Sequence, residues 1–564
     1  MGPSSRASRS ASSTPRAEPE APSRGLPSVG AGGITGACGL IAALIAIPYL
    51  IWEPPSTDLA AQTFRADLWS DHGWVLWNAA WYSGHLVPGY SLIYPPLGAL
   101  LGPQLVGAIS AVAMSVGFAT LVRREVPGRG ADLASIWFAV GAGALLYTGR
   151  ITFLLGFAFA IGALLLVHRP PLAAVGAAVS ALASPVAGLF IALTGAALIL
   201  AGRWREGLPL AIGASIATLA VIVAFPVGGV QPFGLSSFWW VAVACAIAVV
   251  VIPPELRALR IGIALYTALL IGVYFVDTPI GSNAPRLGAM LLGPIAALAL
   301  YEKRPKLLAV VALPLLYWML AAPVGDFIRG QDDPSTEASF YTPLIDELDQ
   351  RVGEEPVRIE VPATQERWEA VYLAEHFPLA RGWLRQLESG DISDFRDGPL
   401  TPEIYRHWLI DHGVSYVALP NATLDYISEL EGRLLEDDDL PFLREVWSND
   451  DWRLWEVLPS VRGKGADPAG DPLASKGARV TELGPDGFTV EVPGAGDYLL
   501  KMSYTPYFQV TRGDACIRRA DAGLTRLKVS PEEGRAEASQ PQEIRVDARL
   551  SFDGLLGVDS TCSG

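Results

Sequence analysis

Apolar segments dominate residues 31–323, and they restrict the fold more than any other feature of the sequence. A helix needs about 20 mainly apolar residues to cross the roughly 30 Å hydrocarbon core of a bilayer. Eleven candidate segments follow one another: 31–51, 98–121, 131–148, 152–168, 171–184, 185–201, 207–225, 236–253, 260–276, 287–301 and 307–323. The two that meet at Ser184-Pro185 are short enough to form a broken pair that does not fully cross. The sequence therefore predicts a polytopic α-helical membrane domain with about 11 transmembrane helices.

Charge divides the chain near residue 323. Of the 57 acidic residues, 12 precede this point and 45 follow it, whereas the 42 Lys and Arg residues divide into 18 and 24. The first part is therefore basic (+6) and the second strongly acidic (−21). This contrast predicts a membrane domain followed by soluble modules. The acidic surface argues against a nucleic-acid partner, because it would repel phosphates.

Basic residues set the expected orientation in the lipid bilayer. If residues 1–30 form a disordered cytoplasmic tail, the clusters at 123–129 and 303–306 also fall on the cytoplasmic side. The first apolar segment has no evident cleavage site, so we expect it to be retained. The sequence thus predicts a multi-pass protein of the plasma membrane, with a cytoplasmic N-terminus. The loop 52–97 and everything after residue 323 would be exoplasmic.

Two exoplasmic modules are expected. Residues 338–460 mix helical runs with the buried strands 357–361 and 416–420, which is typical of an α/β module. A Gly/Pro/Ser-rich joint precedes residues 478–564, whose short alternating segments predict a β-sandwich module. Cys516 and Cys562 lie in this last module on an oxidising side of the membrane, so we expect a disulfide between them.

The loop of roughly 45 residues at 52–97 is the first candidate for a functional site. Loops longer than about 12–15 residues are usually functional or disordered, and this one has too many aromatic residues to be disordered. Asp58 follows the first apolar segment, where a carboxylate could act as general base toward an acceptor hydroxyl. The alternative is that Asp58 only caps a helix over 59–69. Asp67 is the candidate for a second catalytic carboxylate.

Two arginines stand at exoplasmic helix ends, against the usual distribution of positive charge. The guanidinium groups of Arg150 and Arg286 have the geometry that grips phosphate, so both are candidate clamps for a lipid-linked phosphate. Snorkelling or contact with lipid headgroups is the alternative.

Further residues on this side complete the candidate substrate contacts. Most aromatic residues of the loop are expected in an interfacial belt, with Trp77 and Trp81 retained as candidates for stacking on the substrate. His72 and His85 could titrate near neutrality. The remaining candidates are Arg65, Tyr94, Asp277 and Asn283. The sequence has no zinc-type spacing of His and Cys and no phosphate loop, so it assigns no definite cofactor. A divalent metal is the cofactor that we consider.

These features resemble the GT-C superfamily of membrane glycosyltransferases, whose donors are polyprenyl-phosphate sugars. The resemblance rests on Asp58 after the first helix, a long loop closing in Tyr94-Pro95-Pro96-Leu97, about eleven spans and an exoplasmic tail. The stretches Thr57-Asp58-Leu59-Ala60, Tyr82-Ser83-Gly84-His85 and Gly281-Ser282-Asn283 are also similar to those of an actinobacterial group of polytopic proteins.

The resemblance implies a GT-C-like enzyme of cell wall biogenesis that moves a sugar from a polyprenyl-phosphate donor to an envelope glycan acceptor. Asp58 would take the place of the superfamily's first-loop aspartate, and Arg286 would contact phosphate. The chain departs from the pattern because Leu59, not an acid, follows Asp58, which leaves only Asp67 or Asp71 as a second carboxylate. A transporter of lipid-linked intermediates and a non-catalytic envelope scaffold are the alternatives. In an enzyme, Asp58 and Arg286 should converge on one cavity open to lipid.

Overall fold

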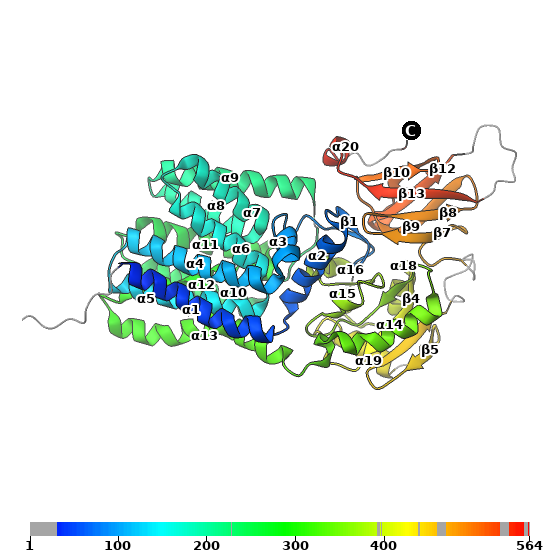
Figure 1. Cartoon of the computed structure of the whole chain (residues 1–564), viewed down its shortest axis with the longest axis horizontal. Coiled ribbons are helices and arrows are strands. Elements are labelled where there is room, and N and C mark those ends of the chain that lie inside the picture. Colours follow the sequence, from blue (N-terminus) through cyan, green and yellow to red (C-terminus); the bar gives the residue numbers. More distant parts are fainter. Residues whose placement is uncertain are drawn as a thin grey trace, which may run out of the picture.

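The computed structural model describes residues 31–226, 228–391, 395, 398–437, 440–458, 470–530, 541–557 and 562. The predicted tail 1–30 lies outside these residues. Figure 1 shows a bundle of helices on the left and two further modules on the right, with α2 and β1 between them.

Seven helices of the described chain are long and apolar enough to cross a membrane. They are α1 (Ala31–Trp52), α4 (Pro103–Glu125), α5 (Arg129–Ala144) with the turn after it, α9 (Trp204–Ala224), α11 (Arg257–Phe275), α12 (Arg286–Leu300) with the turn before it, and α13 (Pro305–Gly330). Four shorter apolar helices lie among them: α6 (Ile151–Leu165), α7 (Pro170–Ala183), α8 (Pro185–Leu200) and α10 (Leu235–Val251). These helices coincide with the eleven predicted segments, but four lack the length to span a bilayer unaided.

Helices α7 and α8 meet at Ser184, which has an extended backbone. The Ser184 hydroxyl accepts a hydrogen bond from the Ala187 N–H (3.4 Å), and Pro185 is the first residue of α8. Proline is favoured at that position because the missing N–H would have no helical partner. The expected break therefore lies between two helices and not inside one.

Two predicted boundaries differ from the structure. Helix α13 continues to Gly330 instead of ending at 323, and Asp326 and Arg329 pair one turn apart in this polar end. The loop 52–97 is also more regular than expected. It contains α2 (Thr57–His72), the short antiparallel strands β1 (Trp77–Asn78) and β2 (His85–Leu86), and the start of α3 (Tyr94–Leu101). Tyr94-Pro95-Pro96 thus opens a helix, as expected for proline in a first turn.

The α/β module follows α13. Its sheet has the order β3-β4-β6-β5, with β3 parallel to β4 and the other pairs antiparallel. Its strands are β3 (Arg358–Glu360), β4 (Val414–Pro420), β5 (Leu443–Ser448) and β6 (Trp452–Val457). Its helices are α14 (Ala338–Val352), α15 (Glu369–Tyr372), α16 (Arg385–Asp391), α18 (Pro402–Asp411) and α19 (Glu429–Asp437).

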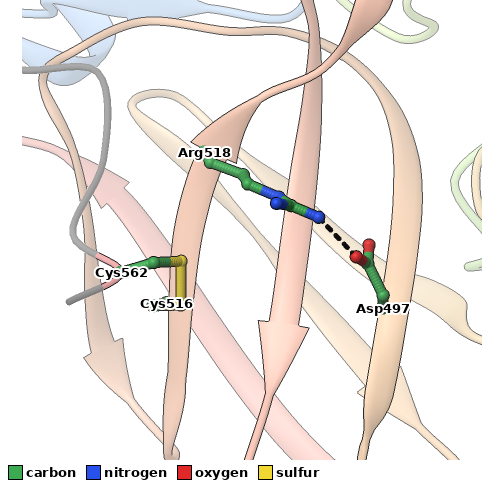
Figure 2. Close-up of a disulfide and its surroundings, with 4 residues drawn as sticks. All are labelled: Asp497, Cys516, Arg518 and Cys562. Atoms are coloured by element: carbon green, nitrogen blue, oxygen red, sulfur yellow. Dashed lines mark hydrogen bonds and ion pairs between the residues drawn. A yellow bond between two sulfur atoms is a disulfide. The ribbon is translucent and has the colours of Figure 1, made fainter. Parts of the chain in front are cut away.

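The last module contains two antiparallel sheets, β10-β13-β8-β7 and β11-β12-β9. Its elements are β7 (Arg479–Gly484), β8 (Gly487–Val492), β9 (Gly496–Ser503), β10 (Phe508–Arg512), β11 (Ala515–Arg519), β12 (Leu524–Val529), β13 (Gln542–Ala548) and α20 (Phe552–Leu555). Cys516 of β11 forms a disulfide with Cys562, close to an ion pair between Arg518 and Asp497 (2.6 Å) (Figure 2).

The region 52–97 joins the three parts of the molecule. The N–H groups of Leu76 and Trp77 donate to the Asp486 carboxylate of the β-sandwich module (2.6 and 2.9 Å). The N–H of Leu379 in the α/β module donates to the Ala80 carbonyl (2.8 Å). This packing explains why so long a connection between two apolar helices is ordered.

Candidate functional site

Asp58, Arg150 and Arg286 come together at the end of the helical bundle that faces the two C-terminal modules. The Asp58 Oδ2 atom lies 2.8 Å from Arg150 Nε and 3.7 Å from Arg286 Nη2. The three side chains are 14%, 23% and 16% exposed, so all are largely withdrawn from solvent. Residues from three distant parts of the sequence thus form one charged cluster.

Helix α2 places Asp58 in this cluster. The helix begins at Thr57 with Ser56 as its N-cap, so Asp58 lies in the first turn and is not the capping residue. The expectation that Asp58 caps this helix is therefore wrong, because Ser56 is the capping residue. The Asp58 carboxylate instead accepts a hydrogen bond from Arg150. Its position in the first turn still suits a negative charge, since the helix dipole is positive there.

Gly149 brings Arg150 close to Asp58. Its φ of +68° lies in the left-handed region, which glycine adopts without steric cost. A Cβ at this position would stand 2.3 Å from the Leu59 nitrogen and 2.5 Å from the Ser56 hydroxyl oxygen. Because residue 149 has no side chain, the turn between α5 and α6 can pack directly against the first turn of α2.

The cluster has an excess of positive charge. Two guanidinium groups face one carboxylate, and among the described residues Arg286 has this ion pair but no hydrogen bond. Burial acts to raise the pKa of Asp58, but Arg150 and then Arg286 outweigh it, and the pKa lies below its ordinary value. Asp58 is thus ionised at neutral pH, and Arg286 retains donors for an anion.

Arg65 lies beside this cluster in an aromatic environment. Its guanidinium carbon stands 3.8 Å from the ring centre of Tyr90, 5.6 Å from that of Trp383 and 5.8 Å from that of Trp81. It also donates to the Ala61 carbonyl (2.8 Å) and is 2% exposed. These contacts are typical of cation–π stabilisation, and they give Arg65 a structural role in the packing of this region.

Asp67 and His72 lie away from Asp58. Nine residues of helix correspond to a rise of about 13 Å between Asp58 and Asp67. Both line a different cleft of about 460 Å³, between α2 and the two C-terminal modules. The Asp67 side chain is exposed to this cleft. Partial desolvation by the surrounding protein, and then the negative charges of Asp71 and Glu375, raise its pKa to about 6.

Both candidate tryptophans pack in the interior. Trp81 stacks between Phe64 and His85 and donates to the Ala370 carbonyl (3.0 Å). Trp77 contacts two phenylalanines of the β-sandwich module. Each indole is at most 1% exposed, so neither is in an interfacial belt and neither presents a free face to a substrate.

Tyr94 is also buried, with no exposed surface. Its hydroxyl donates to the Gln62 carbonyl of α2 (3.1 Å). The contact ties the start of α3 to α2, so this tyrosine stabilises the region 52–97 and does not face a substrate.

His85 does not titrate near neutrality, so that expectation is wrong. Burial and then the neighbouring Arg65 lower its pKa to about 3. The imidazole is therefore neutral at physiological pH, because a charged ring would be desolvated beside a cation.

The turn before α12 positions Arg286. Gly281 to Asn283 form a short 3-10 turn, and the Ser282 hydroxyl accepts a hydrogen bond from Gln231 Nε2 (3.1 Å). Asn283 is half-buried in this turn, whereas Asp277 is exposed before it. The structure brings Arg286 to Asp58 and leaves Asp277 outside the cluster.

The residues at Asp58 do not suit a divalent metal. Its carboxylate already faces two guanidinium groups, which would repel a cation. Within the described residues, no three His, Cys, Asp or Glu side chains are grouped to hold a metal ion.

Sequence reasoning missed the contributions of the α/β module to this region. Trp383 Nε1 donates to the Thr57 carbonyl (2.6 Å), and the Thr57 hydroxyl donates to Glu366 (2.8 Å). Arg329 at the end of α13 pairs with the same Glu366 (3.4 Å). No local pattern in the sequence marks these residues, because each acts through a contact with a distant segment.

No protein-family model and no curated protein matches the chain. Similar solved structures include the arabinofuranosyltransferase AftD from Mycobacteria, at 13% identity and a TM-score of 0.42, covering 92% of this chain and 57% of that one. A mutant of AftD gives 14% identity, a TM-score of 0.44, and coverage of 92% and 60%. The Archaeoglobus fulgidus oligosaccharyltransferase gives 12% identity, a TM-score of 0.41, and 68% coverage of each chain. The chain therefore spans less than two thirds of the AftD chains it matches.

Proposed function

We propose that this protein is a membrane glycosyltransferase that moves a sugar from a polyprenyl-phosphate donor to a cell-envelope glycan acceptor on the exoplasmic side. The observation that carries the proposal is the cluster of Asp58, Arg150 and Arg286. It combines an ionised carboxylate with two phosphate-binding groups at one end of a bundle of apolar helices.

The charge of the cluster fits the proposed donor. One carboxylate and two guanidinium groups sum to a single positive charge, and a sugar–phosphate diester carries a single negative charge. Binding would therefore neutralise the cluster. It would also give Arg286 the hydrogen-bond acceptors that it lacks among the described residues.

In the proposed reaction, the acceptor hydroxyl attacks the anomeric carbon of the donor sugar. The new bond joins this carbon to the acceptor oxygen, and the bond from the carbon to the phosphate oxygen breaks. Asp58 takes the hydroxyl proton as general base, and the arginines stabilise the charge that develops on the departing polyprenyl phosphate. Direct displacement of this kind inverts the configuration at the anomeric carbon.

Donor binding would also make Asp58 a better base. In the described structure, the two arginines hold its pKa below the ordinary value. A phosphate that draws these guanidinium groups to itself would weaken their effect on Asp58 and allow its pKa to rise. The same arginines would thus link donor binding to activation of the acceptor.

The test is to replace the native chain in cells by the Asp58→Asn variant and to analyse envelope glycans and lipid-linked sugars. Asp71→Asn is the matched control, since Asp71 lies on the same helix but lines the cleft that contains Asp67, away from the cluster. We expect Asp58→Asn to lose one glycan linkage and accumulate its polyprenyl donor at a normal protein level, with Asp71→Asn unchanged. An unaltered glycan profile in Asp58→Asn, with a defect on deletion of residues 338–564, would instead support the scaffold alternative.

A further inference from the structure

Residues 382–388 of the α/β module lie against the segments that surround Asp58. Trp383 Nε1 donates to the carbonyl of Thr57, the residue that precedes Asp58 (2.6 Å). The Gln386 carbonyl accepts a hydrogen bond from the N–H of Val230, in the connection between α9 and α10 (2.8 Å). Gly229 permits this approach, because a Cβ there would stand 1.9 Å from the Gln386 carbonyl oxygen. The segment therefore bridges two connections at the same end of the helical bundle.

A buried ionic network fixes the other side of this segment. Arg367 Nη1 donates to the Gly382 carbonyl (2.8 Å) and to Glu388 Oε1 (3.1 Å). Arg367 and Glu388 are 0% and 2% exposed. The Tyr82 hydroxyl, from the region 52–97, also donates to the Gly382 carbonyl (2.7 Å). Because each end is held by buried hydrogen bonds, the segment has a defined position relative to the cluster.

Arg385 is the cation that this segment contributes. Its side chain is 29% exposed, and its only ionic partner among the described residues is Asp425. Asp425 is itself shared with Arg367 (3.4 Å). The guanidinium of Arg385 therefore keeps unpaired donors in the described structure. Its charge also reaches Asp58, since Arg385 is among the groups that lower the pKa of that carboxylate.

We propose that Arg385 is a third phosphate contact, which the α/β module supplies to the site formed by Arg150 and Arg286. This inference rests on the proposed function and deepens it. The polyprenyl phosphate released by the reaction is a monoester with about two negative charges, one more than the donor diester. With the acceptor proton on Asp58, Arg150 and Arg286 balance these two charges. The monoester also has three terminal oxygens, one more than the diester, and Arg385 supplies hydrogen-bond donors for the third. The α/β module is thus part of the active site.

The test measures binding of polyprenyl monophosphate to the full-length protein in nanodiscs of neutral lipid, with uncharged polyprenol as the second probe. Arg385→Gln should weaken monophosphate binding about tenfold, which corresponds to about 1.4 kcal/mol, and leave polyprenol binding unchanged. Arg385→Lys should restore most of the affinity because it keeps the charge. Arg433→Gln, at an exposed ion pair on α19 of the same module, is the control and should bind like the native protein.

The outcomes separate this inference from the proposed function. Arg385→Gln is expected to fold, because Asp425 keeps Arg367 and the Ile427 N–H as partners, and a thermal unfolding curve checks this. Native affinity in Arg385→Gln, together with weak binding in Arg286→Gln, would overturn the role of Arg385 and leave the proposed function intact. Native affinity in both variants would overturn both. Equal loss of monophosphate and polyprenol binding would show that Arg385 only supports the fold.

Discussion

Replacing Gly149 by alanine should damage the protein through one well-defined contact. The residue has a left-handed backbone (φ +68°), which costs an L-residue about 1–2 kcal/mol. The new Cβ would also stand 2.3 Å from the Leu59 nitrogen, which is backbone and cannot rotate away. Overpacking of this kind typically costs about 1–3 kcal/mol. We therefore expect Gly149→Ala to destabilise the protein by about 2–5 kcal/mol.

The backbone shift that relieves this clash should also displace the cluster around Asp58. The turn must move away from α2, and Arg150 is the next residue, so its ion pair with Asp58 (2.8 Å) should lengthen. A misplacement of about 1 Å can cost about 10²-fold in catalysis. If the proposed function holds, sugar transfer by Gly149→Ala should fall by about this factor even where the protein remains folded.

The assay is thermal unfolding of the purified protein in nanodiscs, followed by lipid-linked sugar analysis. Gly162→Ala is the matched control, because Gly162 lies on α6 without a left-handed backbone, and a Cβ added there would meet nothing within 4 Å. Alanine should stabilise that helix by up to about 1 kcal/mol. Native stability in Gly149→Ala would contradict the predicted clash, as would shifts of both variants in the same direction by similar amounts.

Three further outcomes are expected. His85 has a folded pKa of about 3, below its unfolded value of 6.5, so its contribution to stability is present above pH 6.5 and is lost as the pH falls toward 3. His85→Gln should therefore flatten the dependence of the unfolding temperature on pH in this window, and an unchanged dependence would contradict the lowered pKa. Asp67 has a folded pKa raised to about 6, so its ionised form destabilises the protein. Asp67→Asn should raise the unfolding temperature at pH 7.5 but not at pH 4, and a rise at both pH values would point to another cause. Trp77→Ala should lower the free energy of unfolding by about 3–5 kcal/mol, because Trp77 packs on Phe488 and Phe508. Limited proteolysis should then release the β-sandwich module faster than from the native protein, whereas equal resistance would count against this packing.

The helices of the bundle were predictable because the signal is local. A run of apolar residues specifies a helix in lipid whatever its neighbours are, since backbone groups must be satisfied within the segment. The seven long helices and four shorter ones therefore coincide with the predicted segments. Local signals were weaker at the end of α13, where the helix continues beyond the apolar run into a polar end that contains the ion pair between Asp326 and Arg329.

The candidate site was predictable only in part. Asp58, Arg150 and Arg286 were recognisable because charges at the ends of apolar helices are unusual, and the structure does bring the three together. Trp77, Trp81 and His85 are equally suggestive by residue type, but all three are buried against other segments. The same residue types in one loop thus have different environments, and composition does not distinguish them.

Local sequence was enough to place the apolar helices, the distribution of charge along the chain, and the charged residues at the helix ends. Those properties depend on neighbouring residues and on transfer between water and lipid. The hydrogen bond from Trp383 of the α/β module to the first turn of α2, more than 300 residues earlier in the chain, emerged only in three dimensions. Such contacts arise from the packing of separate modules on one another, so no local pattern in either segment records them.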